Sequence, residues 1–479
     1  MVGDSYSLTK EFESPADFFC ARRGILVHMK SFVSDGDIFK LVVWFLVALT
    51  TSLCVSLYFS AFVVFLVACV LSMLGLFVMR PAWGLYTLAF FAPLSGLVID
   101  FSRDQSLSRV PYIGSVNAPV VDFFALILLV VCGVLVVLRP HALHWRAARS
   151  YAWVFAVWFV AVLLSVYFGD ALYFGTAVKA FARPYVFTFV AFALPVMLLA
   201  RGRGELYKSL CAYELACVGG AVMGAASIFL LPAIGFFRAE PFEIFGFAPF
   251  GLNHNVLAEA LTAIIPFAWY AALCAARGSA RRMVMLCAAA LISAVSLATF
   301  SRAAWLVVAA QLACWFVYRQ KHRGHQRITW LIVAVALIGT FFLWIGNTSV
   351  AEGSDATRGD LLGIAYTYFL RAPLFGVGPG TFVSLVGETK IFTMQYGDPL
   401  DAHGVLEKLL PETGIVGTGA FILMLAVVGG ALWHRRRDAF QYMLFVTFVS
   451  VWTYQLFNTG YFAGKVWVLV GICIASLSL

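Results

Sequence analysis

Long runs of apolar residues alternate with short polar segments along the chain, and clusters of Arg, Lys, Gly and Pro separate the runs. Each run is roughly 17–25 residues long, which is the length an α-helix needs to cross about 30 Å of hydrocarbon. The pattern therefore predicts an all-α, polytopic transmembrane protein with about fourteen spans. The predicted spans are 40–58, 61–79, 84–99, 121–138, 151–167, 184–200, 207–231, 257–275, 283–300, 303–318, 328–346, 415–433, 440–457 and 463–479.

The same pattern divides the chain into four sections. Residues 1–39 form a polar N-terminal tail, and residues 40–346 hold the long series of spans. Residues 347–414 form the largest polar segment, and residues 415–479 hold the last three predicted spans.

The composition excludes a soluble domain. Hydrophobic residues make up 62% of the chain and charged residues only 12%, whereas soluble domains are about 25% charged. The net charge of +9 would suit a nucleic-acid partner, but the basic residues lie in loops between spans, where they orient a membrane protein. We therefore expect membrane lipids, and no nucleic acid, among the partners.

Lys and Arg gather in alternate loops, and the positive-inside rule makes that side cytoplasmic. The opposite side carries the segments 100–120, 168–183, 232–256 and 347–414, so we expect any chemistry on that outer face. The basic residues of the cytoplasmic loops are Arg139, Arg146, Arg149, Arg201, Arg203, Lys208, Arg277, Arg281, Arg282, Arg319, Lys321, Arg323, Arg327, Arg435, Arg436 and Arg437.

Arg302 stands where one span ends and the next begins on the outer side. Ser301 is a predicted N-cap, so Arg302 falls in the first turn beside free backbone N–H groups. A cation is unfavourable there unless an anion joins it, and an arginine fork with a helix N-terminus can grip a phosphate. The alternative is that Arg302 pairs with a loop carboxylate or extends to lipid headgroups.

Two more outer-face arginines permit the same interpretation. Asp355 or Thr357 is expected to cap a surface helix, with Arg358 in its first turn. Arg183 precedes Pro184, a residue suited to a first helical turn. Either arginine could instead be a solvated charge or an interfacial anchor. The apolar residues at helical spacing in the surface helix are Leu361, Leu362, Ala365, Tyr368 and Phe369.

His403 lies among carboxylates just before a predicted span. A histidine can take up a proton near neutral pH, and a neighbouring carboxylate such as Asp401 can fix its tautomer. Glu407, four residues on, would share a helical face with His403. The alternative is a structural histidine at the surface.

Two further segments offer polar or backbone contacts on the outer face. Asn253 and Asn255 begin another span and offer hydrogen bonds for hydroxyl groups, or they can simply cap that helix. The glycine-rich segment 373–380 can approach a ligand backbone closely.

In order along residues 245–425, these motifs resemble the O-antigen ligase and polymerase family of bacterial inner-membrane glycan transferases. The resemblance implies a GT-C-like helical protein with its active site facing the periplasm. It also implies transfer from an undecaprenyl-diphosphate-linked glycan to a sugar hydroxyl, with no metal, nucleotide or other cofactor. The motifs are Gly251 to Asn255, Ser301 with Arg302, Arg358 before an amphipathic helix, Pro373 to Gly380, and His403 to Gly417.

Carried over residue by residue, the resemblance gives His403 the role of catalytic base. Arg302, Arg358 and, less directly, Arg183 would bind the diphosphate. Supporting or acceptor-binding roles would fall to Asp401, Glu407, Asn253 and Asn255. One departure concerns the acceptor: the family often has Asn directly after this histidine, whereas this chain has Gly404.

The acceptor stays open between lipid A core, as in a ligase, and a second lipid-linked repeat, as in a polymerase. About fourteen spans favour a polymerase, whereas the single well-placed histidine favours a ligase. A transporter or flippase of lipid-linked glycans is the alternative from another class. Transporters place ionisable residues near the bilayer midplane, and the spans here are nearly free of charge, with Glu214 as the clearest exception.

Overall fold

The computed structural model describes residue 47 and residues 61–100, 117–230, 238–319 and 349–479. Seven of its helices are long and apolar enough to cross a membrane, which confirms a helical, multi-pass membrane protein. The predicted span 328–346 lies outside the described residues, as does 40–58 apart from Val47. A small antiparallel ribbon, β1 (Val98–Asp100) with β2 (Asn117–Pro119), was not expected.

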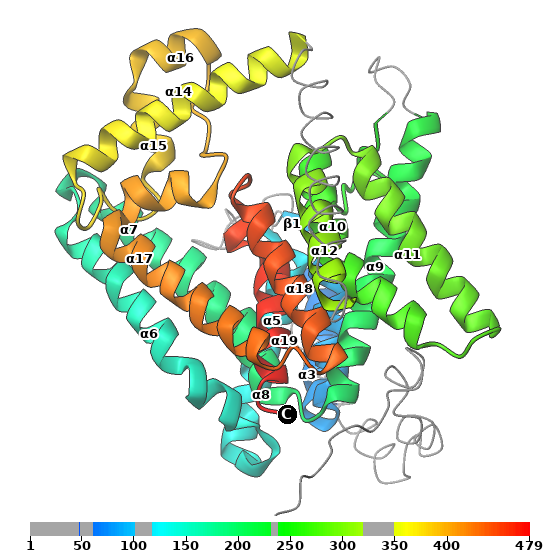
Figure 1. The fold of residues 1–479 in the computed structure, drawn as a ribbon. Helices are drawn as coiled ribbons and strands as arrows, with labels where there is room; N and C mark the ends of the chain where they lie inside the picture. The colour runs from blue at the N-terminus through cyan, green and yellow to red at the C-terminus, as the bar shows by residue number, and fades with distance from the viewer. Residues whose placement is uncertain (1–46, 48–60, 101–116, 231–237, 320–348) are drawn as a thin grey trace, which may run out of the picture.

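The first half of the described chain is a helical bundle (Figure 1). The span predicted at 84–99 is shorter than expected, because its helix ends at Phe91 and Pro93 cannot continue a helix. The helices are α3 (Ala61–Met79), α4 (Pro81–Phe91), α5 (Val120–Leu138), the 3₁₀ turn η2 (Pro140–Ala142), α6 (Trp145–Phe168) and α9 (Arg203–Leu230).

A continuous helical segment between α6 and α9 contains two wide, π-type stretches. Pro184 lies inside one of them rather than in a first turn, so the predicted start of a helix at Arg183 is wrong. Pro184 lacks a backbone N–H, and a π-type turn is one way for a helix to accommodate that loss. The pieces are η3 (Ala171–Tyr173), α7 (Phe174–Ala180), η4 (Phe181–Phe187), η5 (Phe189–Ala193) and α8 (Leu194–Leu199).

The second half adds further apolar helices and a polar group of helices, α14–α16. In Figure 1, α14–α16 lie at one end of the molecule, and α3 and α8 lie towards the other. The elements are α10 (His254–Cys274), α11 (Ala280–Ala298), α12 (Arg302–Arg319), α14 (Ser349–Arg371), α15 (Phe382–Glu388), α16 (Lys390–Tyr396), α17 (Val405–His434), α18 (Ala439–Gln455), η7 (Gly460–Phe462) and α19 (Gly464–Ser476).

Helices α14–α16 have a hydrophobic core of their own, apart from the main core of the bundle. Leu361 and Ala365 of α14 are buried in it, as their helical spacing predicts, whereas Leu362 is exposed. The predicted cap is wrong, because α14 already begins at Ser349 and Asp355 lies inside the helix. The other buried members are Phe382, Val386, Phe392 and Ala402.

Helix α17 starts at Val405, well before the predicted span start at 415, and is interrupted at Gly414 (φ 62°, ψ −166°). The glycine-rich segment 373–380 runs beside this break. The Val377 N–H donates to the Pro411 carbonyl at 2.8 Å, and the Ile415 N–H donates to the Pro373 carbonyl at 2.9 Å. Backbone groups freed by the break therefore find partners.

Glycines allow this close approach between the two stretches of backbone. A Cβ at Gly376 (φ 72°) would lie 2.3 Å from the Glu412 carbonyl carbon, and one at Gly414 would lie 2.4 Å from that of Leu374. The segment thus braces the break in α17. The sequence suggested a close approach to a ligand, and the observed partner of Gly376 is the protein's own backbone.

Candidate active site

His403 lies in the connection between α16 and α17 and is half-buried. Its backbone N–H donates to Glu407 Oε2 at 2.9 Å, and the Gly404 N–H donates to the same oxygen at 3.1 Å. Glu407 therefore caps the start of α17 and fixes the backbone that carries His403.

Asp401 takes a different partner. Lys408 Nζ donates to both Asp401 carboxylate oxygens, at 2.8 and 2.7 Å. Lys408 is buried and also lies over the Phe462 ring, 5.6 Å from its centroid. The Asp401–Lys408 pair ties the connection before α17 to the first turns of that helix.

The surroundings of His403 favour the neutral imidazole. Burial lowers the pKa of His403 below its usual value, and the Arg358 guanidinium acts in the same direction, whereas Asp401 opposes them. A neutral imidazole at neutral pH has a lone pair that can accept a proton.

Arg358 comes from α14, yet its charge acts on both His403 and Glu407. The fold thus brings together an arginine and a histidine that the sequence analysis named separately. Arg358 lies well inside α14 rather than in its first turn, so the helix N-terminus does not contribute to an anion site as predicted.

Three of the other segments named in the sequence analysis contact the C-terminal end of α18. A Cβ at position 404 would lie 2.4 Å from the Leu456 carbonyl oxygen, so Gly404 packs directly against that turn. Two residues earlier, the Tyr454 hydroxyl lies 3.1 Å from Ser301 Oγ and donates to the Asn255 carbonyl at 2.7 Å. The starts of α10, α12 and α17 therefore converge on the last turn of α18.

Arg302 is the first residue of α12, and Ser301 directly before it is non-helical, as predicted. Ser301 is buried, with its hydroxyl beside Tyr454. Asn253 accepts a hydrogen bond from the Asn255 N–H at 2.8 Å and so caps α10. The structure therefore shows the capping role of Asn253.

Arg183 lies apart from these contacts. Its guanidinium is 3.8 Å from Asp122 Oδ2 at the start of α5, and its side chain is 67% exposed. The charges that act on His403 are those of Arg358 and Asp401, and Arg183 is not among them.

A buried polar network below the end of α18 was missed from the sequence. Glu259 of α10 is 2.7 Å from Lys465 of α19, and it accepts hydrogen bonds from Gln455 at 2.7 Å and Asn458 at 3.0 Å. In the sequence, the charges of this network appear as isolated charged residues inside apolar runs. Glu259 and Lys465, like Glu214, are therefore buried charged residues within the spans.

Glu412, in the braced part of α17, is another buried carboxylate. It is fully buried and accepts a hydrogen bond from the Phe382 N–H at 3.0 Å. Its backbone carbonyl accepts from Ser165 Oγ at 2.7 Å and from the Gly378 N–H at 3.0 Å. Glu412 thereby links α15 and the glycine-rich segment to α17.

Residues 286–422 match a family model described as O-Antigen ligase. The matched region contains the start of α12, all of α14–α16, His403 and the broken part of α17. No curated protein matches the chain. The match confirms the resemblance seen in the sequence motifs: residues 286–422 are similar to the O-antigen ligase family.

Proposed function

We propose that this protein transfers a glycan from undecaprenyl diphosphate to a hydroxyl acceptor on the periplasmic face of a bacterial inner membrane. The observation that carries the proposal is the half-buried His403 at the start of α17, with its backbone held by Glu407, inside the matched region. In this orientation residues 347–414 are periplasmic. The excess of Lys and Arg in the opposite loops supports that orientation.

In the proposed reaction, His403 takes the proton from the acceptor hydroxyl as the oxygen attacks the anomeric carbon. The bond from that carbon to the diphosphate oxygen breaks, and negative charge builds on the leaving group. In this scheme Arg358 and Arg302 would stabilise that charge. Direct displacement would invert the anomeric configuration, and the step needs no metal or nucleotide.

The remaining predicted residues take supporting roles in this scheme. Glu407 holds the backbone at His403, and Asp401 favours the imidazolium that forms during the reaction. We assign acceptor contacts to Asn255 and Asn253, at the start of α10, and a peripheral donor contact to Arg183.

Two acceptors fit this scheme. Lipid A core would make the protein a ligase, and a second lipid-linked repeat would make it a polymerase. Both present a sugar hydroxyl to His403, so the proposed catalytic step is common to them.

A second candidate, a transporter of lipid-linked glycans, has one observation in its favour. The buried pair of Glu259 and Lys465 lies within apolar helices, and ionisable groups inside spans often mark transport pathways. The pair is fully engaged with Gln455 and Asn458, which favours a structural role.

The test uses purified protein, an undecaprenyl-diphosphate glycan, and both acceptors in parallel. Glycosylated lipid A would identify a ligase, and elongated lipid-linked chains a polymerase. His403→Ala should reduce either product by about 10²-fold or more, whereas His141→Ala, at an exposed position in η2, should leave it unchanged. Donor movement across liposomes without product would favour the transporter, and full activity in His403→Ala would overturn the assigned base.

A further inference from the structure

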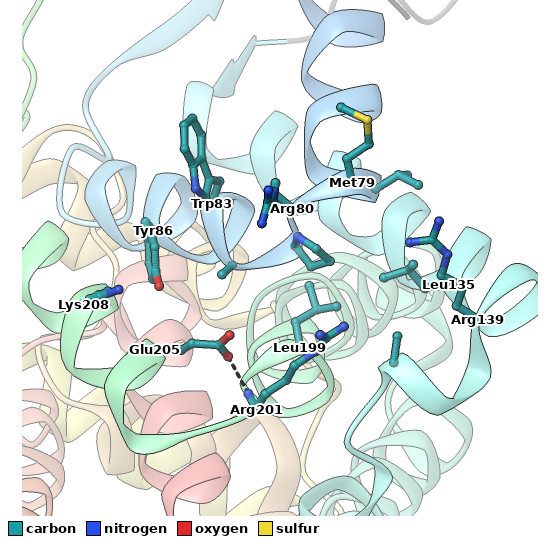
Figure 2. A pocket seen from close by; sticks show the side chains of 14 residues that line it. Met79, Arg80, Trp83, Tyr86, Leu135, Arg139, Leu199, Arg201, Glu205 and Lys208 are labelled. Carbon is teal, nitrogen blue, oxygen red and sulfur yellow. Dashed lines mark hydrogen bonds between the residues drawn. The ribbon is translucent and has the colours of Figure 1, made fainter. Parts of the chain in front are cut away.

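A cavity lined by several charged side chains (Figure 2) lies among helix ends that are at the end of the bundle away from α14–α16 (Figure 1). It has a volume of 400 Å³ and is lined by the adjoining ends of α3 and α4, the end of α5 and the start of α9. The proposed transfer reaction uses none of its residues.

The lining of this cavity carries an excess of positive charge. Arg80, Arg139, Arg201 and Lys208 line it, and among its described lining residues Glu205 is the one carboxylate. Glu205 Oε2 accepts a hydrogen bond from the Arg201 backbone N–H at 2.6 Å, so the carboxylate already has a hydrogen-bond partner just before the start of α9. Figure 2 shows these basic side chains around the cavity, and they come from different parts of the chain.

Apolar surface adjoins the cavity. Trp83 of α4 lines it with 47% of its side chain exposed, and Leu138, at the end of α5, is 66% exposed. Tyr86 completes an aromatic pair in the lining. Aromatic side chains of this kind are typical of the boundary between hydrocarbon and water.

We propose that the cavity binds the phosphate headgroup of an anionic phospholipid. Arginine forks match phosphate oxygens in geometry and charge. The exposed apolar surface of α4 and α5 would accommodate the acyl chains beside the headgroup. Because Arg139, Arg201 and Lys208 belong to loops that the positive-inside rule makes cytoplasmic, the lipid would come from the cytoplasmic leaflet, where basic pockets between spans bind phospholipid headgroups.

The test titrates the full-length protein in uncharged detergent with cardiolipin, and follows the bound species by native mass spectrometry. Phosphatidylcholine serves as the lipid control, and inorganic phosphate as a competitor without acyl chains. The test variant is the triple change Arg80→Gln, Arg139→Gln and Arg201→Gln. A matched control removes three exposed cations from the same end that do not line the cavity, Arg146→Gln, Arg149→Gln and Arg277→Gln.

Each basic residue near a lipid phosphate changes affinity about fivefold, so the triple variant should raise the dissociation constant for cardiolipin about a hundredfold. The control variant should bind as the wild type does. A separate change, Glu205→Gln, should tighten binding about fivefold, a gain that a misfolded protein would not show. The proposal is overturned if the two triple variants bind cardiolipin equally. It also fails if inorganic phosphate binds as tightly as cardiolipin, because the acyl chains would then contribute nothing.

Discussion

Glu259 and Lys465 form an ion pair with 2.7 Å between Oε2 and Nζ, and their side chains are only 5% and 4% exposed. The pair joins α10 to α19 through the interior of the bundle. Gln455 and Asn458 donate to the same carboxylate, so the pair also anchors the end of α18, against which Gly404 packs.

Removing one member of this pair should be costly. Lys465→Met leaves the Glu259 carboxylate buried without its cation, and breaking a buried pair in this way costs about 3–5 kcal/mol. We expect a clearly lower thermal unfolding temperature in detergent. The double variant with Glu259→Gln carries no buried charge at the site and should recover part of the loss. Equal stability of the single and double variants would contradict this account.

The brace between segment 373–380 and α17 predicts a second stability effect. Gly414→Ala introduces a Cβ at positive φ and 2.4 Å from the Leu374 carbonyl carbon, which should cost about 1–3 kcal/mol. Gly419→Ala lies in the same helix with open space around the new Cβ and should be at least as stable as the wild type. Thermal unfolding of the two variants side by side measures the difference, and equal behaviour would show that the break in α17 tolerates a side chain.

The sequence predicted the helices of this protein better than their ends. Apolar runs identify spans because an uninterrupted helix is the main way to satisfy backbone groups in hydrocarbon. The span was predicted to start at 415 from its apolar run, whereas α17 already starts at Val405 and continues past Pro411 and the break at Gly414. Hydrogen bonds from the distant segment 373–380 hold the helix together across that point, and no local pattern contains them.

For the candidate site, too, the sequence predicted individual residues but not the contacts that bring them together. His403 and Arg358 were named individually from local chemistry, but their mutual influence depends on how α14 packs on α17. The residues around which the site is built, Tyr454 and Leu456, were missed, because a tyrosine and a leucine near the end of a span carry no distinctive signal. The role of Leu456 is carried by its backbone carbonyl, which the identity of a side chain does not reveal.

Gly404 offers a test of how tightly the backbone before α17 packs against the end of α18. Its φ of −140° suits any residue, so the constraint is steric: a Cβ would lie 2.4 Å from the Leu456 carbonyl oxygen. Gly404→Ala should displace His403 and lower kcat by up to about 10²-fold. Gly404→Asn, although Asn is common at this position in the family it resembles, should lose activity as well. Gly387→Ala in α15, where the nearest atom would be 3.6 Å away, is the control, and it should turn over normally.

The pH dependence of transfer gives the sharpest test of the base. In the proposed mechanism neutral His403 is the active form, so kcat/KM should fall as the pH drops through the pKa of His403, which burial and Arg358 hold below its usual value. Arg358→Gln removes a nearby cation, which raises the pKa of His403 and moves the acid limb to higher pH. Asp401→Asn removes the opposing charge and leaves Lys408 behind, which lowers the pKa and moves the limb to lower pH.

The position of the acid limb reports each shift even where the maximal rate also falls. Arg183→Gln is the matched control, because its guanidinium lies beside Asp122 and does not act on His403, so its limb should coincide with that of the wild type. Shifts of the same sign in Arg358→Gln and Asp401→Asn would mean that the group titrating in the profile is not His403.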